Sequence, residues 1–140
     1  MVRSLVSEQA VDSAARRSSS SVETTDDKEY VMKYLLLICA EEGVEVTPEE
    51  ADATPWLEEV ERRGVRLDGD RLRGVSEATT VRVRKDELMI TDGPFAESKE
   101  QLAGYDVIDC ADLDEAIEIA SKHPVARFGS VEVRPFWEGA

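Results

Sequence analysis

The stretch KYLLLIC, residues 33–39, decides the fold class. Successive side chains of a β-strand point to opposite faces of a sheet, so this stretch would carry an apolar row on each face. A strand that is apolar on both faces is typical of the centre of a sheet that is covered on both sides. We therefore predict a central strand here, with helices over one face and another protein surface over the other.

The pattern on the C-terminal side of this strand alternates between helix and strand signals. TTVRVR, residues 79–84, predicts a strand with one apolar face, and Asp112 with Glu115 predicts a capping box before a helix. The predicted elements are, in order, a broken helix over 48–63, short extended pieces around an Asp68–Gly69 turn, strands over 79–84 and 86–92 joined by a turn at Lys85 and Asp86, a strand over 105–109, a helix that begins after Asp112 and is stopped by Pro124, and a strand over 130–135.

This order fits two split βαβ units, so the predicted fold class is α+β. We expect a ferredoxin-like sandwich with both helices on one face of the sheet. The second apolar face of the sheet needs a cover, because a large apolar surface is unfavourable in water. We expect a second copy of the chain to supply it, packing sheet against sheet into a homodimeric α/β barrel that encloses a lumen.

The first 31 residues differ in character from the rest. They contain RRSSSSVETTDDKE, residues 16–29, which cannot bury enough apolar surface to offset its chain entropy. We predict a disordered N-terminal extension over 1–31 and one folded domain over 32–140. A transit peptide would be poorer in acidic residues. A regulatory tail stays open, as does an upstream start codon chosen in error, which a natural start at Met32 favours.

Composition excludes several classes of partner. The 31 acidic and 17 basic residues give a net charge of −14, which repels nucleic acid. The longest apolar run, from Tyr34 to Ala40, is far shorter than the roughly 20 residues that cross a bilayer. We expect a soluble protein with no membrane partner. No stretch resembles a secretory signal, so the expected location is the cytoplasm.

Cysteine and histidine are too sparse to indicate a metal or cofactor site. Cys39 and Cys110 show no CxxC pairing and are predicted to be reduced core thiols. The one histidine, His123, comes before Pro124 at a helix end, where an interaction with the helix dipole is its simplest role. Without a Cys/His cluster or a Gly-rich loop that opens a helix, the sequence implies no metal and no cofactor.

The stretch TDGPFAESKEQLAGYDVID, residues 91–109, holds the candidate chemistry. Asp92 is a candidate acid or base if its carboxylate faces an enclosed, poorly hydrated space. The Asp-Gly-Pro sequence is explained equally well as a turn. Phe95 is a candidate substrate-binding residue, with a role as an anchor for the loop as the alternative.

Three cations are candidates to bind an anionic ligand. Lys99 follows Asp92 closely in the sequence and could hold a carboxylate or an enolate. Arg127 comes just before the last strand, and Arg134 lies within it. The simpler interpretation is a surface charge for Lys99 and Arg127, and a structural pair with Glu132 for Arg134.

The segments DGPFAESKEQLAGYDVIDCADLDEAIEIA, residues 92–120, and GSVEVRP, residues 129–135, closely resemble the DGPF-type branch of the YCII-related family. The family motif is DGPFAETKEQLGG, from which only Ser98 and Ala103 depart. The resemblance covers residues 32–135 and implies a dimeric α+β barrel. Members are mostly of unassigned function, and many are similar to proteins encoded beside extracytoplasmic-function sigma factors.

The resemblance transfers one candidate residue. The YciI-like branch of the family has a proposed pair of His and Asp as its active site. His123 sits at a helix end before Pro124, so that pair is not carried over to this chain. Asp92 transfers, because it belongs to the DGPF motif itself.

Two classes of function therefore stay open. The first is binding of a small anionic or carbonyl compound between the sheets, with cofactor-independent acid/base catalysis in which Asp92 moves the proton and Lys99 or Arg127 holds charge. The second is a non-catalytic accessory or sensor module, linked to an extracytoplasmic-function sigma factor, whose DGPF segment shapes a protein-binding loop. A small oxygenase of the same barrel architecture is a third option.

Overall fold

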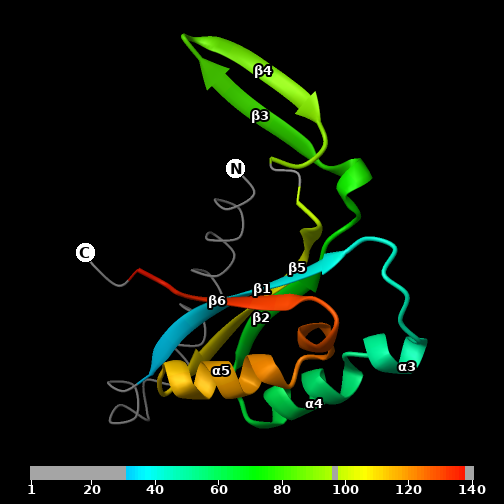
Figure 1. Cartoon of the computed structure of the whole chain (residues 1–140). Helices are drawn as coiled ribbons and strands as arrows, with labels where there is room; N and C mark the ends of the chain where they lie inside the picture. Colours follow the sequence, from blue (N-terminus) through cyan, green and yellow to red (C-terminus); the bar gives the residue numbers. More distant parts are fainter. Residues whose placement is uncertain (1–30, 96–97, 138–140) are drawn as a thin grey trace.

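The computed structural model describes residues 31–95 and 98–137. The helices lie on one face of a four-stranded sheet. A separate two-stranded hairpin rises on the side of the sheet that is opposite the helices (Figure 1). The elements are β1 (Met32–Glu41), α3 (Pro48–Ala51), α4 (Thr54–Arg62), β2 (Arg66–Arg71), η2 (Val75–Glu77), β3 (Thr79–Arg84), β4 (Glu87–Asp92), β5 (Glu100–Cys110), α5 (Leu113–Ser121), η3 (Pro124–Arg127) and β6 (Ser130–Pro135).

The larger sheet has the strand order β2-β5-β1-β6, with β1 between β5 and β6. All three of its pairings are antiparallel: β1 with β5, β1 with β6, and β2 with β5. This is the topology of two interleaved split βαβ units, so the predicted ferredoxin-like α+β fold is confirmed. The dimeric barrel stays a prediction, because the structure is that of one chain.

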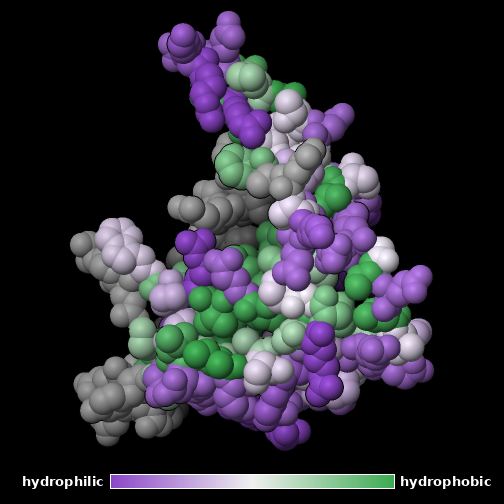
Figure 2. All heavy atoms as spheres, in the orientation of Figure 1, coloured by the Kyte–Doolittle hydropathy of each residue, from purple (hydrophilic) through white to green (hydrophobic). Residues whose placement is uncertain are grey.

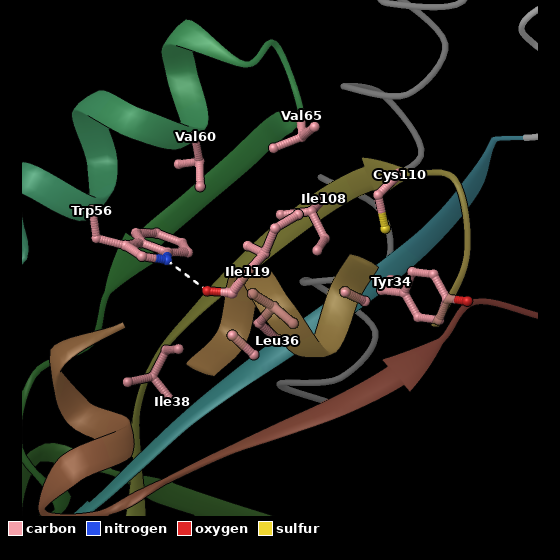
Figure 3. Close-up of a cluster of buried hydrophobic side chains, with 11 residues drawn as sticks. Tyr34, Leu36, Ile38, Trp56, Val60, Val65, Ile108, Cys110 and Ile119 are labelled. Atoms are coloured by element: carbon pink, nitrogen blue, oxygen red, sulfur yellow. Dashed lines mark hydrogen bonds between the residues drawn. The ribbon is translucent and has the colours of Figure 1, made fainter. Parts of the chain in front are cut away.

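The main core lies between the sheet and the helices. Its buried members are Tyr34, Leu36, Ile38, Trp56, Val60, Val65, Ile108, Cys110, Ala116, Ile119 and Ala120 (Figure 3). A second cluster, with Tyr105 and Val107 buried and Leu35 packed beside them, lies on the opposite face of the sheet, since strand side chains alternate between faces. The prediction of a central strand that is apolar on both faces is therefore confirmed.

Local capping signals place the helices as expected. The helical segment over 48–63 is broken in two, and Thr47 caps α3 through a reciprocal bond with Glu50. Asp112 caps α5 by accepting a hydrogen bond from the Glu115 amide at 2.9 Å. The Glu115 carboxylate accepts from Ala111, one residue before the cap, so this box is not the reciprocal one that we predicted.

The predicted Asp68–Gly69 turn is wrong. β2 continues through both residues, and its register with β5 skips Leu67, as in a β-bulge. Glycine is needed at position 69 for a different reason. A Cβ there would overlap the Asp106 side chain and would come within 2.8 Å of the Tyr105 carbonyl oxygen.

Two strands also differ from their predicted places. The turn at Lys85 and Asp86 is confirmed, with positive φ at both residues. However, β3 pairs only with β4, in a hairpin separate from the four-stranded sheet, so its valines lie outside the main core. β5 begins at Glu100, five residues earlier than predicted. Residues 1–30 of the predicted disordered extension lie outside the described residues.

The two cysteines are free, as predicted, but only Cys110 belongs to the main core. Cys39 is half-buried and points to the face of the sheet opposite the helices, because it alternates with Ile38.

Candidate functional site

Asp92 lies at the foot of the hairpin. It is the last residue of β4 and pairs with Thr79 at the start of β3. The following turn is held by other groups: the Gly93 amide donates to the Ala78 carbonyl oxygen at 2.8 Å, and the Thr80 hydroxyl donates to the Gly93 carbonyl oxygen at 2.8 Å. The Asp92 carboxylate is exposed and forms no hydrogen bond or ion pair within residues 31–95 and 98–137. The turn therefore does not use this carboxylate.

Phe95, three residues after Asp92, contacts Arg82 of the hairpin. Its side chain is 76% exposed, and the Arg82 guanidinium lies over its ring at 5.3 Å from the centroid. Arg82 also donates a long hydrogen bond to the Phe95 carbonyl oxygen, at 3.5 Å. A cation over an aromatic face is a weak attraction at an exposed site. Phe95 thus anchors one side of the hairpin and leaves most of its ring in water.

Lys99 and Arg127 lie at the end of the sheet from which the hairpin leaves. Lys99 directly precedes β5 and Arg127 ends η3, before β6, and both side chains are exposed. Since β5 and β6 are both antiparallel to β1, their first residues lie at the same sheet end. A hydrogen bond from the Ser130 hydroxyl to the Glu100 carboxylate, at 2.6 Å, joins the two strand starts. The fold therefore places Lys99 and Arg127 at one sheet end, next to the segment that leads from Asp92 and Phe95 into β5, and no hydrogen bond or ion pair among the described residues joins these four side chains.

Arg134 lies away from this group. It is near the end of β6 and pairs in register with Leu35, on the face of the sheet opposite the helices. Its guanidinium contacts the Glu132 carboxylate at 3.3 Å, and both side chains are more than half exposed. The predicted structural pair is confirmed, and the fold does not bring Arg134 to the sheet end that holds Lys99 and Arg127.

A buried ion pair between Asp106 and Arg66 was missed by the sequence reasoning. Asp106 is only 6% exposed, and its carboxylate accepts a hydrogen bond from Arg66 Nε at 2.9 Å. Burial raises the pKa of Asp106 to about 6, although the hydrogen bond from Arg66 opposes this rise. Arg66 also reaches Glu61 of α4, at 3.7 Å. The pair connects β2, β5 and α4.

A sequence signal for this pair did exist. Asp106 lies two residues before Ile108 in a strand, so alternation places its carboxylate on the core-facing side. A carboxylate on that side requires a cation or several hydrogen-bond donors. The strand register shows which cation supplies it, and that register could not be read from the sequence.

His123 has a different role from the predicted helix-dipole interaction. Its ring is buried and packs edge-on against Trp56, with centroids 4.7 Å apart. Its Nδ1 accepts a hydrogen bond from the Val125 amide at 3.1 Å and so caps η3. Burial lowers the pKa of His123 to about 4. The ring is therefore neutral near pH 7, whereas an interaction with the dipole would need the charged form.

We expect His123 to weaken the fold in acid. A histidine whose folded pKa is below its unfolded value of about 6.5 stabilises the native state above that value, and the stabilisation is lost as pH falls toward 4. His123→Asn keeps a capping acceptor but does not titrate. It should unfold more easily than the wild type at pH 7 and lose about 2 kcal/mol less between pH 7 and pH 4, allowing for residual solvent contact. Parallel pH dependences of unfolding in urea would contradict this role.

The part of the chain that the structure describes was also compared with the requirements of a metal site and of a membrane-spanning helix. No group of three or more His, Cys, Asp or Glu side chains in it is placed to hold a metal ion. No helix in it has the length and apolar character needed to cross a membrane.

Comparisons with known proteins agree with this architecture. The model of the YCII-related domain matches residues 32–139, most of the chain. A protein of Rhizobium meliloti (strain 1021), described as "Uncharacterized protein R00369", is 49% identical over 67 residues, which cover 46% of this chain. The match spans 54% of that relative, about half of its length. The chain belongs to the YCII-related family.

Proposed function

We propose that two copies of the chain pack through the sheet faces opposite the helices, in the cytoplasm, and bind a small anionic or carbonyl-bearing compound. In this proposal the compound binds between Asp92 at the foot of the hairpin and the cations Lys99 and Arg127 at the neighbouring sheet end. Asp92 transfers a proton to or from the compound without a cofactor, and Lys99 or Arg127 holds its negative charge.

The unused carboxylate of Asp92 carries this proposal. In an ordinary Asp-Gly-Pro turn the aspartate side chain bonds to backbone amides of the turn. Here the Gly93 amide donates to the Ala78 carbonyl oxygen and the Thr80 hydroxyl donates to the Gly93 carbonyl oxygen, both at 2.8 Å. The Asp92 carboxylate forms no hydrogen bond or ion pair with any described residue. Its position is thus fixed by the hairpin while both of its oxygens remain available to a ligand.

Asp92→Asn tests the catalytic part of the proposal. The amide keeps the size of the side chain but cannot take up a proton at neutral pH. We expect a metabolite library to contain a small anionic or carbonyl compound that raises the melting temperature of wild type and variant alike. Turnover of that compound should fall by roughly 10²- to 10⁴-fold in Asp92→Asn, the usual contribution of a general acid or base.

The matched control is Asp86→Asn at the tip of the same hairpin. It makes the same change of charge, at a residue whose positive φ suits asparagine. Turnover by Asp86→Asn should equal that of the wild type. Equal turnover by both variants would remove Asp92 from catalysis, and a library without any stabilising compound would remove the ligand site.

The exposed apolar side chains of the hairpin favour a second candidate function, a non-catalytic accessory or sensor module. In that role the hairpin and its DGPF loop contact another protein, such as an extracytoplasmic-function sigma factor. The library experiment separates the two functions, because a purely protein-binding module gains no stability from small anions or carbonyl compounds.

A further inference from the structure

The β3–β4 hairpin stands away from the body of the protein. Its strands pair only with each other, and neither packs substantially on another described element (Figure 1). An isolated two-stranded hairpin is marginally stable in water and normally needs a further strand or a packing surface. Figure 2 shows hydrophobic side chains among the hydrophilic ones along its length. The hairpin therefore carries surface that is suited to a contact.

The two faces of the hairpin differ in composition. Residues paired across an antiparallel ribbon point to the same side, and Val81 pairs with Ile90 as Val83 pairs with Leu88. We call these four side chains the apolar face; they are 37%, 60%, 58% and 65% exposed, respectively. The other face carries Arg82, Arg84, Glu87 and Met89, and near its foot Thr80 is buried.

Asp92 belongs to the apolar face. It lies two residues after Ile90 on the same strand, so its carboxylate shares the side of Ile90 and Leu88. Whatever covers the apolar face therefore approaches the Asp92 carboxylate as well.

The position and length of the hairpin favour a second copy of the chain as the occupant. It rises from the sheet on the side away from α4 and α5, which is the side through which the proposed dimer packs (Figure 1). Six residues per strand extend roughly 20 Å, whereas sheets packed face to face lie about 10 Å apart. The hairpin is therefore long enough to pass the partner's sheet and reach its helix layer.

We propose that the apolar face of the hairpin clasps a second copy of this chain packed on the sheet, and that the partner thereby encloses Asp92. The contact is isologous, because each copy gives its hairpin to the other around a two-fold axis. This inference rests on the proposed function and adds to it that each ligand site is complete only when the partner covers it.

Ile90→Glu and Leu88→Glu test the clasp. Both side chains are exposed in the single chain, so each variant should fold with the secondary structure of the wild type. We expect the dimer dissociation constant, measured by sedimentation equilibrium, to rise by at least about 100-fold, because the clasp would bury the new charge without a partner of opposite sign. Met89→Glu is the matched control on the opposite face of β4, and its dissociation constant should stay within about threefold of the wild type.

Hydrogen exchange of the wild-type protein gives a second readout that needs no variant. The amides of β3 and β4 should exchange at least about 10-fold more slowly in the dimer than after dilution to monomer. Equal exchange in both states would overturn the clasp, as would unchanged dimerisation of both Glu variants. Those outcomes would leave a sheet-to-sheet dimer and its ligand intact. A wild-type protein that stays monomeric at high concentration would overturn the clasp and the proposed dimer together.

Discussion

Replacing Arg66 with Met is expected to lower the free energy of unfolding by about 3 kcal/mol at pH 8, and by clearly less at pH 5. The substitution removes the hydrogen bond from Arg66 Nε to the Asp106 carboxylate, 2.9 Å long in the wild type, and leaves that carboxylate buried. Removing one partner of a buried ion pair is costly, because the remaining charge is desolvated without compensation.

The pH dependence follows from the pKa of Asp106. Burial raises that pKa from 3.8 to about 6, so the folded state keeps the proton to a higher pH than the unfolded state. The contribution of such a group favours folding at low pH and is lost as pH rises through its folded pKa. Arg66 lowers the pKa of Asp106, so the variant should bind the proton more tightly still. Protonation at pH 5 then relieves most of its defect.

Urea denaturation of wild type and Arg66→Met at pH 5 and pH 8 measures this difference. Arg73→Met is the control, because Arg73 forms an exposed ion pair with Glu77 at 3.0 Å and should cost less than about 0.5 kcal/mol at either pH. A loss in Arg66→Met that matches the control, or that does not change with pH, would show that Asp106 does not depend on Arg66.

Features set by neighbouring residues could be read from the sequence. The apolar composition of the strand that contains Leu36 indicates by itself that both faces of the strand are buried. Thr47 and Asp112 indicate helix starts, because an N-cap contact spans only three residues. Local signals of this kind predict the order of strands and helices, and that order predicts the ferredoxin-like topology.

Features that depend on residues far away in the sequence could not be predicted from the sequence. Asp68 and Gly69 carry the local chemistry of a turn, but glycine is required at position 69 by the close approach of another strand, at the Tyr105 carbonyl oxygen and the Asp106 side chain. The alternation of Val81 and Val83 correctly indicates a strand with one apolar face, yet alternation does not say which surface covers that face.

The candidate site was predictable to a similar extent. The DGPF motif located Asp92 and Phe95, and their place on one loop follows from sequence proximity. The arrival of Arg127 at the same end of the sheet as Lys99 depends on β5 and β6 running in the same direction. Arg134 was included among the candidate residues because the sequence shows that a predicted strand carries a charge. The sequence does not show how far Arg134 lies from the loop that follows Asp92.

Trp56→Ala is expected to cost about 4 kcal/mol of unfolding free energy, the largest loss that we predict for one residue. Trp56 is buried in the main core, and its indole Nε1 donates a hydrogen bond to the Ile119 carbonyl oxygen at 2.9 Å (Figure 3). Its ring also contacts His123 edge-on. This one side chain therefore joins α4 to α5 and to the cap of η3, and alanine would leave a cavity and an unpaired carbonyl.

Two further variants divide this loss into its parts. Trp56→Phe keeps most of the apolar volume but leaves the Ile119 carbonyl without its donor, so it should cost about 1–2 kcal/mol. Trp137→Ala removes the second tryptophan, which is 88% exposed, and should change stability by less than about 0.5 kcal/mol while leaving Trp56 as the only indole that reports unfolding by fluorescence. If Trp56→Ala unfolded at the same urea concentration as Trp137→Ala, the packing of α4 on α5 could not depend on this residue. If Trp56→Phe lost as much as Trp56→Ala, the hydrogen bond rather than the buried volume would hold the two helices together.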